Sequence, residues 1–170
     1  MLLDLINFEK LKRALLYFAV VLVVMALQTL LFSRLRLFGA APMFVPAVVT
    51  AIALFEGGVW GAAFGLVTGI LCALRYSGTV LLFPLLFSVI GFFSGLLAQF
   101  VMNRRFFSYF ALSVAAFLLT AFCQMFRPLF FLNAAPVSVL RVGLFQVLWS
   151  LPFPFLIYFP VKNIGRRALR

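Results

Sequence analysis

Long apolar stretches without a single Asp, Glu, Lys or Arg dominate this sequence of 170 residues. A helix needs about 20 such residues to cross the ~30 Å hydrocarbon core of a bilayer, and each stretch has roughly that length. The sequence therefore predicts an all-α membrane protein, a single polytopic domain over residues 1–170 with six transmembrane helices. The predicted spans are Ala14–Phe32, Leu37–Phe55, Gly57–Leu74, Thr79–Met102, Phe106–Phe126 and Val142–Val161.

The overall composition excludes other classes of protein. Hydrophobic residues make up 66% of the chain and charged residues 10%, whereas a soluble domain is about half apolar and a quarter charged. Such a chain is also too apolar to remain a solvated coil. The net charge of +11 comes from basic residues between the apolar stretches and not from a basic face with stacking aromatics. Nucleic acid is therefore not an expected partner, and membrane lipids are.

The basic residues between the predicted spans set the expected orientation. In a six-span topology one side holds nine of them and the other side five, so the positive-inside rule places both termini in the cytoplasm. Residues 1–13 precede the first span, and they are either a short amphipathic segment on the membrane surface or a disordered tail. The nine are Lys10, Lys12, Arg13, Arg104, Arg105, Lys162, Arg166, Arg167 and Arg170, and the five are Arg34, Arg36, Arg75, Arg127 and Arg141.

A row of glycines is the strongest local pattern. Glycines recur every four residues in the third predicted span, and a second pair with the same spacing occurs in the fourth. On a helix this spacing forms a groove that lets another backbone approach closely. The row is expected to pack against a helix of the same chain or against a partner protein. These helix-packing or partner-binding residues are Gly57, Gly61, Gly65, Gly69, Gly91 and Gly95.

Proline and polar residues mark further positions inside the spans. Pro152 and Pro154 are expected to bend the last helix near its middle. Uncharged polar side chains inside the spans are expected to face the bundle interior and to form hydrogen bonds across helices. These residues are Gln28, Thr50, Thr68, Ser88, Gln99, Thr120, Gln124 and Gln146. Glu56, in a one-residue turn, is either solvated or paired with Arg104, Arg105 or a partner protein. Four candidates for polar contacts are thus Glu56, Gln99, Gln124 and Gln146.

The sequence gives little basis for catalysis. It contains no histidine, no paired carboxylates, no metal-ligand cluster and no phosphate-binding loop. Its two cysteines, Cys72 and Cys123, lie inside apolar stretches and are expected to be small core residues. We therefore expect neither an enzyme nor a cofactor or metal, and a transporter of charged solutes would carry buried charges that these spans lack.

Two segments resemble the bacterial rod shape-determining protein MreD family. They read Glu56-Gly-Gly-Val-Trp-Gly-Ala-Ala-Phe-Gly-Leu-Val-Thr-Gly-Ile-Leu and Leu82-Phe-Pro-Leu-Leu-Phe-Ser-Val-Ile-Gly-Phe-Phe-Ser-Gly-Leu. Their glycines match the spacing of the family pattern. The first span ending in Leu27-Gln28-Thr29-Leu30 and the closing Gln146-Val-Leu-Trp extend the likeness over nearly the whole chain. Where the family carries an acidic residue, this chain reads Cys72-Ala73-Leu74-Arg75.

This resemblance implies a non-enzymatic scaffold subunit of the cell-elongation (rod shape) complex in the bacterial inner membrane. Such a subunit binds the single-span protein MreC, and through the complex it helps to organise the RodA glycosyltransferase with its penicillin-binding transpeptidase. It thereby influences peptidoglycan synthesis and cell shape.

The family's fold is expected to be related to the substrate-binding subunits of energy-coupling-factor transporters, and this relation supplies an alternative function, the capture of a vitamin. The predicted outer loop Arg127–Arg141 would then cap the ligand, whereas in the scaffold hypothesis it would contact MreC or lipid headgroups. The alanines of the first span, Ala14, Ala19 and Ala26, do not match the Ala-xxx-Ala motif of such subunits.

Overall fold

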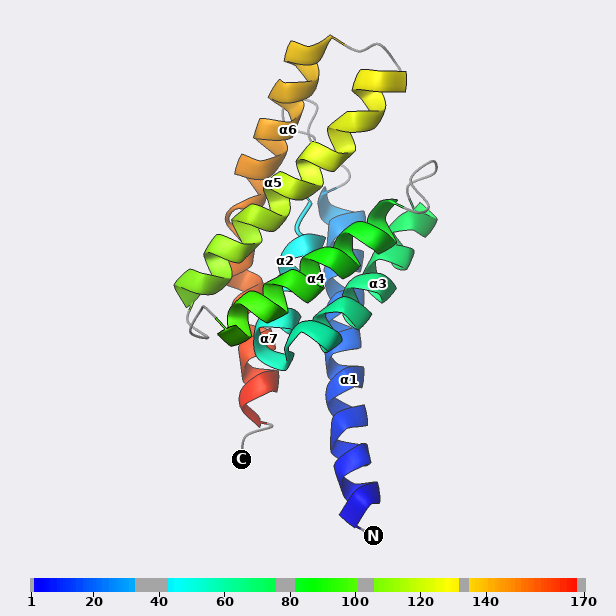
Figure 1. Ribbon diagram of the computed structural model, residues 1–170, viewed down its shortest axis with the longest axis vertical. Coiled ribbons are helices and arrows are strands. Elements are labelled where there is room, and N and C mark those ends of the chain that lie inside the picture. Colours follow the sequence, from blue (N-terminus) through cyan, green and yellow to red (C-terminus); the bar gives the residue numbers. More distant parts are fainter. Residues whose placement is uncertain (1, 33–42, 76–81, 101–105, 132–134, 168–170) are drawn as a thin grey trace.

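The protein is entirely helical in those parts that the computed structural model describes, which are residues 2–32, 43–75, 82–100, 106–131 and 135–167. Figure 1 shows the helices packed side by side, with the α5–α6 hairpin extending beyond the others at one end. The elements are α1 (Leu2–Leu27), the short π-helix η1 (Gln28–Phe32), α2 (Val45–Glu56), α3 (Gly58–Arg75), α4 (Leu82–Phe100), α5 (Phe106–Phe131), α6 (Pro136–Ser150) and α7 (Phe153–Arg167).

Helix α2 forms the centre of the fold. Every residue from Val45 to Leu54 is buried, and the helix contacts α1, α3, α4, α5 and α7. From Val45 to Leu54 the helix is apolar on all sides except for Thr50, as expected for a helix with no solvent-facing side. Pro46 lies in the first turn, where a missing N–H costs no helical hydrogen bond. The helix ends at Glu56, and the Gly57 that follows has a φ of 98°, a conformation that favours glycine.

Several helices are long and apolar enough to cross a membrane. Among the described residues, three pass this criterion on their own: Lys10–Leu30, Leu82–Phe100 and Phe106–Phe130. A fourth span results if α6 and α7 are taken as one bent span. Two further helices, Val45–Glu56 and Gly58–Leu74, are apolar but shorter. The all-helical architecture and the membrane-spanning character predicted from the sequence are thus present, with three to four candidate spans by this criterion where six were predicted.

The last predicted span is interrupted as expected. Helix α6 ends at Ser150, α7 begins at Phe153, and the two axes differ by 46°. Pro152 lies in the break and cannot donate the backbone hydrogen bond that would continue the helix. The prediction of a bend at the Pro152-Phe-Pro154 segment is therefore confirmed.

Two connecting segments differ from the prediction. Residues 2–13 are neither a surface segment separate from the first span nor a disordered tail, because α1 runs without interruption from Leu2 to Leu27. The predicted outer loop Arg127–Arg141 is also wrong over most of its length, since α5 continues to Phe131 and α6 begins at Pro136. Both errors arose because the predicted spans were ended at charged residues, whereas a long cationic side chain can leave a helix and reach water without ending it.

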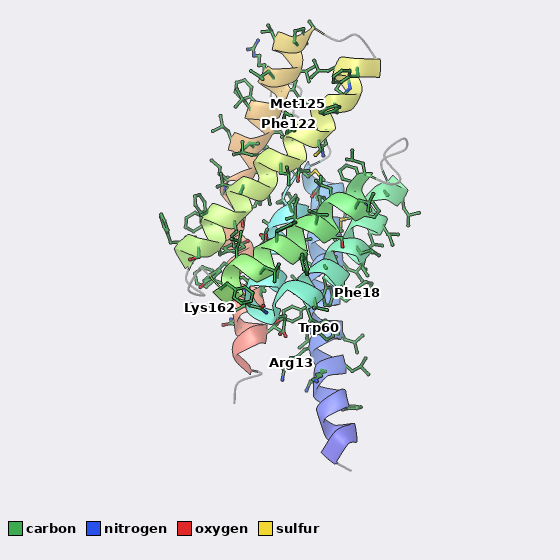
Figure 2. The ribbon with its side chains drawn as sticks, in the orientation of Figure 1. Arg13, Phe18, Trp60, Phe122, Met125 and Lys162 are labelled. Atoms are coloured by element: carbon green, nitrogen blue, oxygen red, sulfur yellow. The ribbon has the colours of Figure 1, made fainter. Side chains whose placement is uncertain are left out.

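Both ends of the chain lie at the same end of the molecule in Figure 1. Arg13 of α1 and Lys162 of α7 are labelled near that end in Figure 2, while Phe122 and Met125 of α5 lie toward the opposite one. An even number of crossings would produce this arrangement. Five of the basic residues used for the predicted orientation, Arg34, Arg36, Arg104, Arg105 and Arg170, lie outside the described residues.

Candidate functional site

The glycine row of α3 packs against α4 of the same chain. The two helices run antiparallel, so that Gly58 lies by Gly95, Gly61 by Gly91, and Gly69 by Pro84. All six glycines that the sequence singled out are buried: Gly57, Gly61, Gly65, Gly69, Gly91 and Gly95. The expected groove therefore exists, and α4 fills it.

The approach of the two backbones leaves no room for a side chain. A Cβ placed on Gly61 would lie 2.5 Å from the Gly91 carbonyl oxygen, and one placed on Gly69 would lie 2.6 Å from the Phe83 carbonyl oxygen. A Cβ on Gly65 would meet the Phe87 carbonyl even more closely. Because these neighbours are backbone atoms, they cannot move aside as a side chain can. Glycine is required here by close packing, as in other small-xxx-small helix pairs.

A hydrogen bond and a side-chain contact supplement this packing. The Ser88 hydroxyl on α4 donates to the Ala62 carbonyl oxygen on α3 at 3.2 Å. At the end of the pair the Gln99 amide lies over Gly57, within the space that a Cβ would occupy. The Gln99 side chain is otherwise exposed, so the expectation that it faces the bundle interior is wrong.

The outer face of this α3–α4 hairpin, which points away from the contact between the two helices, is apolar and exposed. On α3 the exposed residues include Val59, Leu66 and Ile70, and on α4 they include Leu85 and Phe93. An exposed apolar surface of this kind suits lipid or the apolar helix of another protein. Any partner that reaches the hairpin while α3 and α4 remain together would meet this outer face and not the glycine row.

Glu56 lies beside the first helix and not in an isolated turn. The Tyr17 hydroxyl of α1 donates to Glu56 Oε1 at 2.8 Å, and the ring of Tyr17 is 1% exposed. The ring also packs edge-on against Phe64 of α3. The predicted partners Arg104 and Arg105 lie outside the described residues. The pairing with Tyr17 joins residues 39 positions apart, and no local pattern in the sequence indicated it.

Gln124 and Gln146 form a second polar cluster on α5 and α6. Gln146 Nε2 donates to Gln124 Oε1 at 3.2 Å, and Gln124 Nε2 donates to the Met43 sulfur at 2.9 Å. The backbone N–H of Met43 in turn donates to Ser150 Oγ at 3.0 Å, which fixes the start of the α2 segment to α6. Met43, Gln146 and Ser150 line a small cavity together with Phe117, Thr120 and Val147. Of the four candidate polar residues, Gln124 and Gln146 bond each other. Glu56 bonds Tyr17 instead, and Gln99 lies over Gly57.

A third polar contact joins α2 to α5 and confirms the expectation that Thr50 bonds across helices, although its partner Ser113 was not predicted. Thr50 Oγ1 lies 3.1 Å from Ser113 Oγ, and the Tyr109 hydroxyl donates to the Ala47 carbonyl oxygen at 3.2 Å. Of the polar residues expected to bond across helices, Thr68 instead donates to Phe64 of its own helix. Thr120 likewise donates to Ala116. Such back-bonding satisfies a hydroxyl in an apolar environment without requiring a neighbour.

The polar contacts described above, Tyr17 with Glu56, Gln124 with Gln146 and Thr50 with Ser113, join neighbouring helices. Among the residues that the structure describes, no three His, Cys, Asp or Glu side chains gather as metal ligands would. The fold and these contacts define a class: an all-helical protein with several membrane-spanning candidates, held together by glycine packing and interhelical hydrogen bonds. Compared with protein families, with curated proteins and with solved structures, the chain matches none.

Proposed function

We propose that this chain is a multi-pass scaffold of the bacterial inner membrane and acts in the cell-elongation complex, as its resemblance to the MreD family implies. In this proposal the six predicted stretches all cross the membrane, with both termini in the cytoplasm. The shorter helices α2 and α3 cross within the bundle, and α6 and α7 cross as one bent span. MreC is the direct partner, and RodA with its penicillin-binding transpeptidase is reached through the complex.

The observation that carries the proposal is the α3–α4 hairpin. The two segments that resemble the family are the same two that pack through glycines, at Gly61 on Gly91 and at Gly65 on Phe87. A hairpin without intervening side chains is a stiff element, because its backbones have no flexible atoms between them. Its outer face remains apolar and uncovered, at residues such as Leu66 on α3 and Phe93 on α4. A scaffold needs such a rigid element that presents a fixed surface to its partners.

Co-purification with MreC tests the proposal. The tagged chain and MreC are produced together in a rod-shaped bacterium, extracted in mild detergent and captured through the tag. We expect MreC to be retained by the natural chain and lost from Gly61→Leu and Gly65→Leu, because a leucine separates α3 from α4. Gly143→Leu is the matched control, since Gly143 lies on α6 outside the hairpin and a side chain added there meets the movable end of Met125. Size-exclusion profiles of all variants show whether the protein remains monodisperse.

Two results would count against this function. Retention of MreC by both leucine variants would show that the integrity of the hairpin is irrelevant to binding. A tightly held vitamin in stoichiometric amount in the purified chain would instead favour the alternative, a substrate-binding subunit of an energy-coupling-factor transporter.

A further inference from the structure

A charged cleft lies between α1 and the turn that joins α2 to α3. It is partly open to the surface, has a cavity volume of about 70 Å³ and is lined by Lys10, Arg13, Ala14, Tyr17, Glu56 and Trp60. Figure 2 labels Arg13 on α1 and Trp60 on the neighbouring α3 at this end of the molecule. The glycine packing and the scaffold proposal do not use these charged residues, so the cleft calls for its own explanation.

The cleft carries side chains of both charges. Lys10 and Arg13 are three residues apart on α1 and therefore share one face of that helix. Glu56 is the last residue of α2, and the Tyr17 hydroxyl donates to its Oε1 atom at 2.8 Å. That hydrogen bond orients the carboxylate and leaves its second oxygen able to accept another donor. A ligand that matches the cleft carries an anionic group toward α1 and a cationic donor toward Glu56.

The cleft also lies at the boundary between charged residues and the exposed apolar surface of α1 and α3. Lys10 is the first residue of the span candidate Lys10–Leu30, and the residues that follow on α1 expose apolar side chains, such as Leu15 at 60%. On α3, Val59 is 78% exposed beside Trp60, whose ring is 41% exposed. Tryptophan at the boundary between charged and apolar surface is typical of the headgroup level of a membrane.

We propose that this cleft binds the headgroup of a phospholipid that carries a primary amine next to its phosphate, of the phosphatidylethanolamine class. Lys10 and Arg13 bind the phosphate, Glu56 accepts a hydrogen bond from the ammonium group, and Trp60 packs at the glycerol level. The acyl chains continue along the exposed apolar surface of α1 and α3. This lipid site goes beyond the scaffold function and does not depend on it.

Native mass spectrometry of the delipidated full chain in detergent tests the site. Phosphatidylethanolamine, phosphatidylcholine and phosphatidylglycerol with identical acyl chains are added in turn at equal concentration, and the lipid-bound fraction is measured. We expect the ethanolamine lipid to be retained most strongly, because choline has no hydrogen to donate to Glu56 and glycerol has no charge. Glu56→Gln keeps an oxygen that can accept from Tyr17, and it should abolish the preference for the ethanolamine lipid over the glycerol lipid.

The cationic side is tested by charge removal with a matched control. Each of Lys10→Gln and Arg13→Gln should lower lipid affinity about fivefold, the equivalent of about 1 kcal/mol per cation at a membrane surface. Lys162→Gln is the control, because Lys162 lies at the same end of the molecule but over the Tyr158 ring, 5.0 Å from its centre. It should leave lipid binding unchanged.

Three results would overturn the lipid site. The first is equal retention of the three lipids. The second is an equal loss of lipid in Lys162→Gln and Lys10→Gln, which would show that general surface charge and not the cleft holds the lipid. The third is displacement of the bound lipid by millimolar glycerophosphoethanolamine, because a soluble phosphate ester would then be the occupant.

Discussion

The contact between Gly61 and Gly91 predicts an unusually large effect of a single added methyl group. In Gly91→Ala the new Cβ would overlap the Gly61 carbonyl group, and α3 and α4 would have to move apart. Overpacking of a tight interior costs typically 1–3 kcal/mol, and the upper end applies here because backbone atoms on both sides resist displacement. Alanine gains up to about 1 kcal/mol over glycine in helix propensity. The expected net loss of stability is therefore about 2 kcal/mol.

Gly143 provides a control with the same chemical change. A Cβ at Gly143 would also overlap an atom, but that atom is Met125 Cε, the end of a flexible side chain. Methionine can adopt another rotamer at little cost. Gly143→Ala gains the same helix propensity. The difference in stability between the two variants therefore measures the cost of the clash with backbone atoms. We expect Gly143→Ala to change stability by less than about 1 kcal/mol.

Thermal unfolding in detergent, followed with a thiol-reactive fluorogenic dye, measures this difference. Cys72 is fully buried on α3 beside Met25, so its thiol reacts only when the helices separate, and Cys123→Ser removes the second thiol. At roughly 2–4 °C per kcal/mol for a chain of this size, Gly91→Ala should lower the Tm by roughly 4–8 °C. A Tm for Gly91→Ala equal to or above that of Gly143→Ala would refute the close packing of α3 on α4.

Two further predictions concern the polar contacts. Tyr17→Phe should lower the stability by about 1 kcal/mol, because it removes the hydrogen bond to Glu56, and the same dye assay measures the change. Gln124→Leu should cost more than Gln146→Leu, since among the described residues the Gln124 side chain bonds both Gln146 and Met43, whereas the Gln146 side chain bonds Gln124. The reverse order of the two Tm values would contradict this network.

Features that depend on a short stretch of sequence within one helix were predictable. The glycine row predicted close helix packing because four-residue spacing places all its members on one side of a helix, whatever the partner. The bend at Pro152 was predictable for the same reason, since proline acts on its own helix. The identity of the partner helix was not predictable, because α4 reaches the row only through the antiparallel register that joins Gly61 to Gly91.

Contacts between residues far apart in the sequence, and the exact ends of some helices, were not predicted. The hydrogen bond from Tyr17 to Glu56 joins α1 to the end of α2. No local sequence pattern indicates that these two residues meet. The ends of α5 and α6 were misplaced because hydropathy falls at a charged residue while helical hydrogen bonding continues. Arg141 illustrates this, since it lies inside α6 with its guanidinium 5.9 Å from the centre of the Phe145 ring one turn later.

The central claim is that α4 of the same chain occupies the glycine row and leaves only the outer face of the hairpin to partners. Paired cysteines test it directly in membranes of the Cys72→Ser, Cys123→Ser protein. Ala62→Cys with Ser88→Cys replaces two residues already joined by a hydrogen bond, whereas Ala62→Cys with Ser138→Cys places the second thiol on the exposed start of α6. Upon mild oxidation the account predicts a rapid disulfide within one chain for the first pair alone. A disulfide between two chains, or an equally rapid one in the second pair, would contradict it.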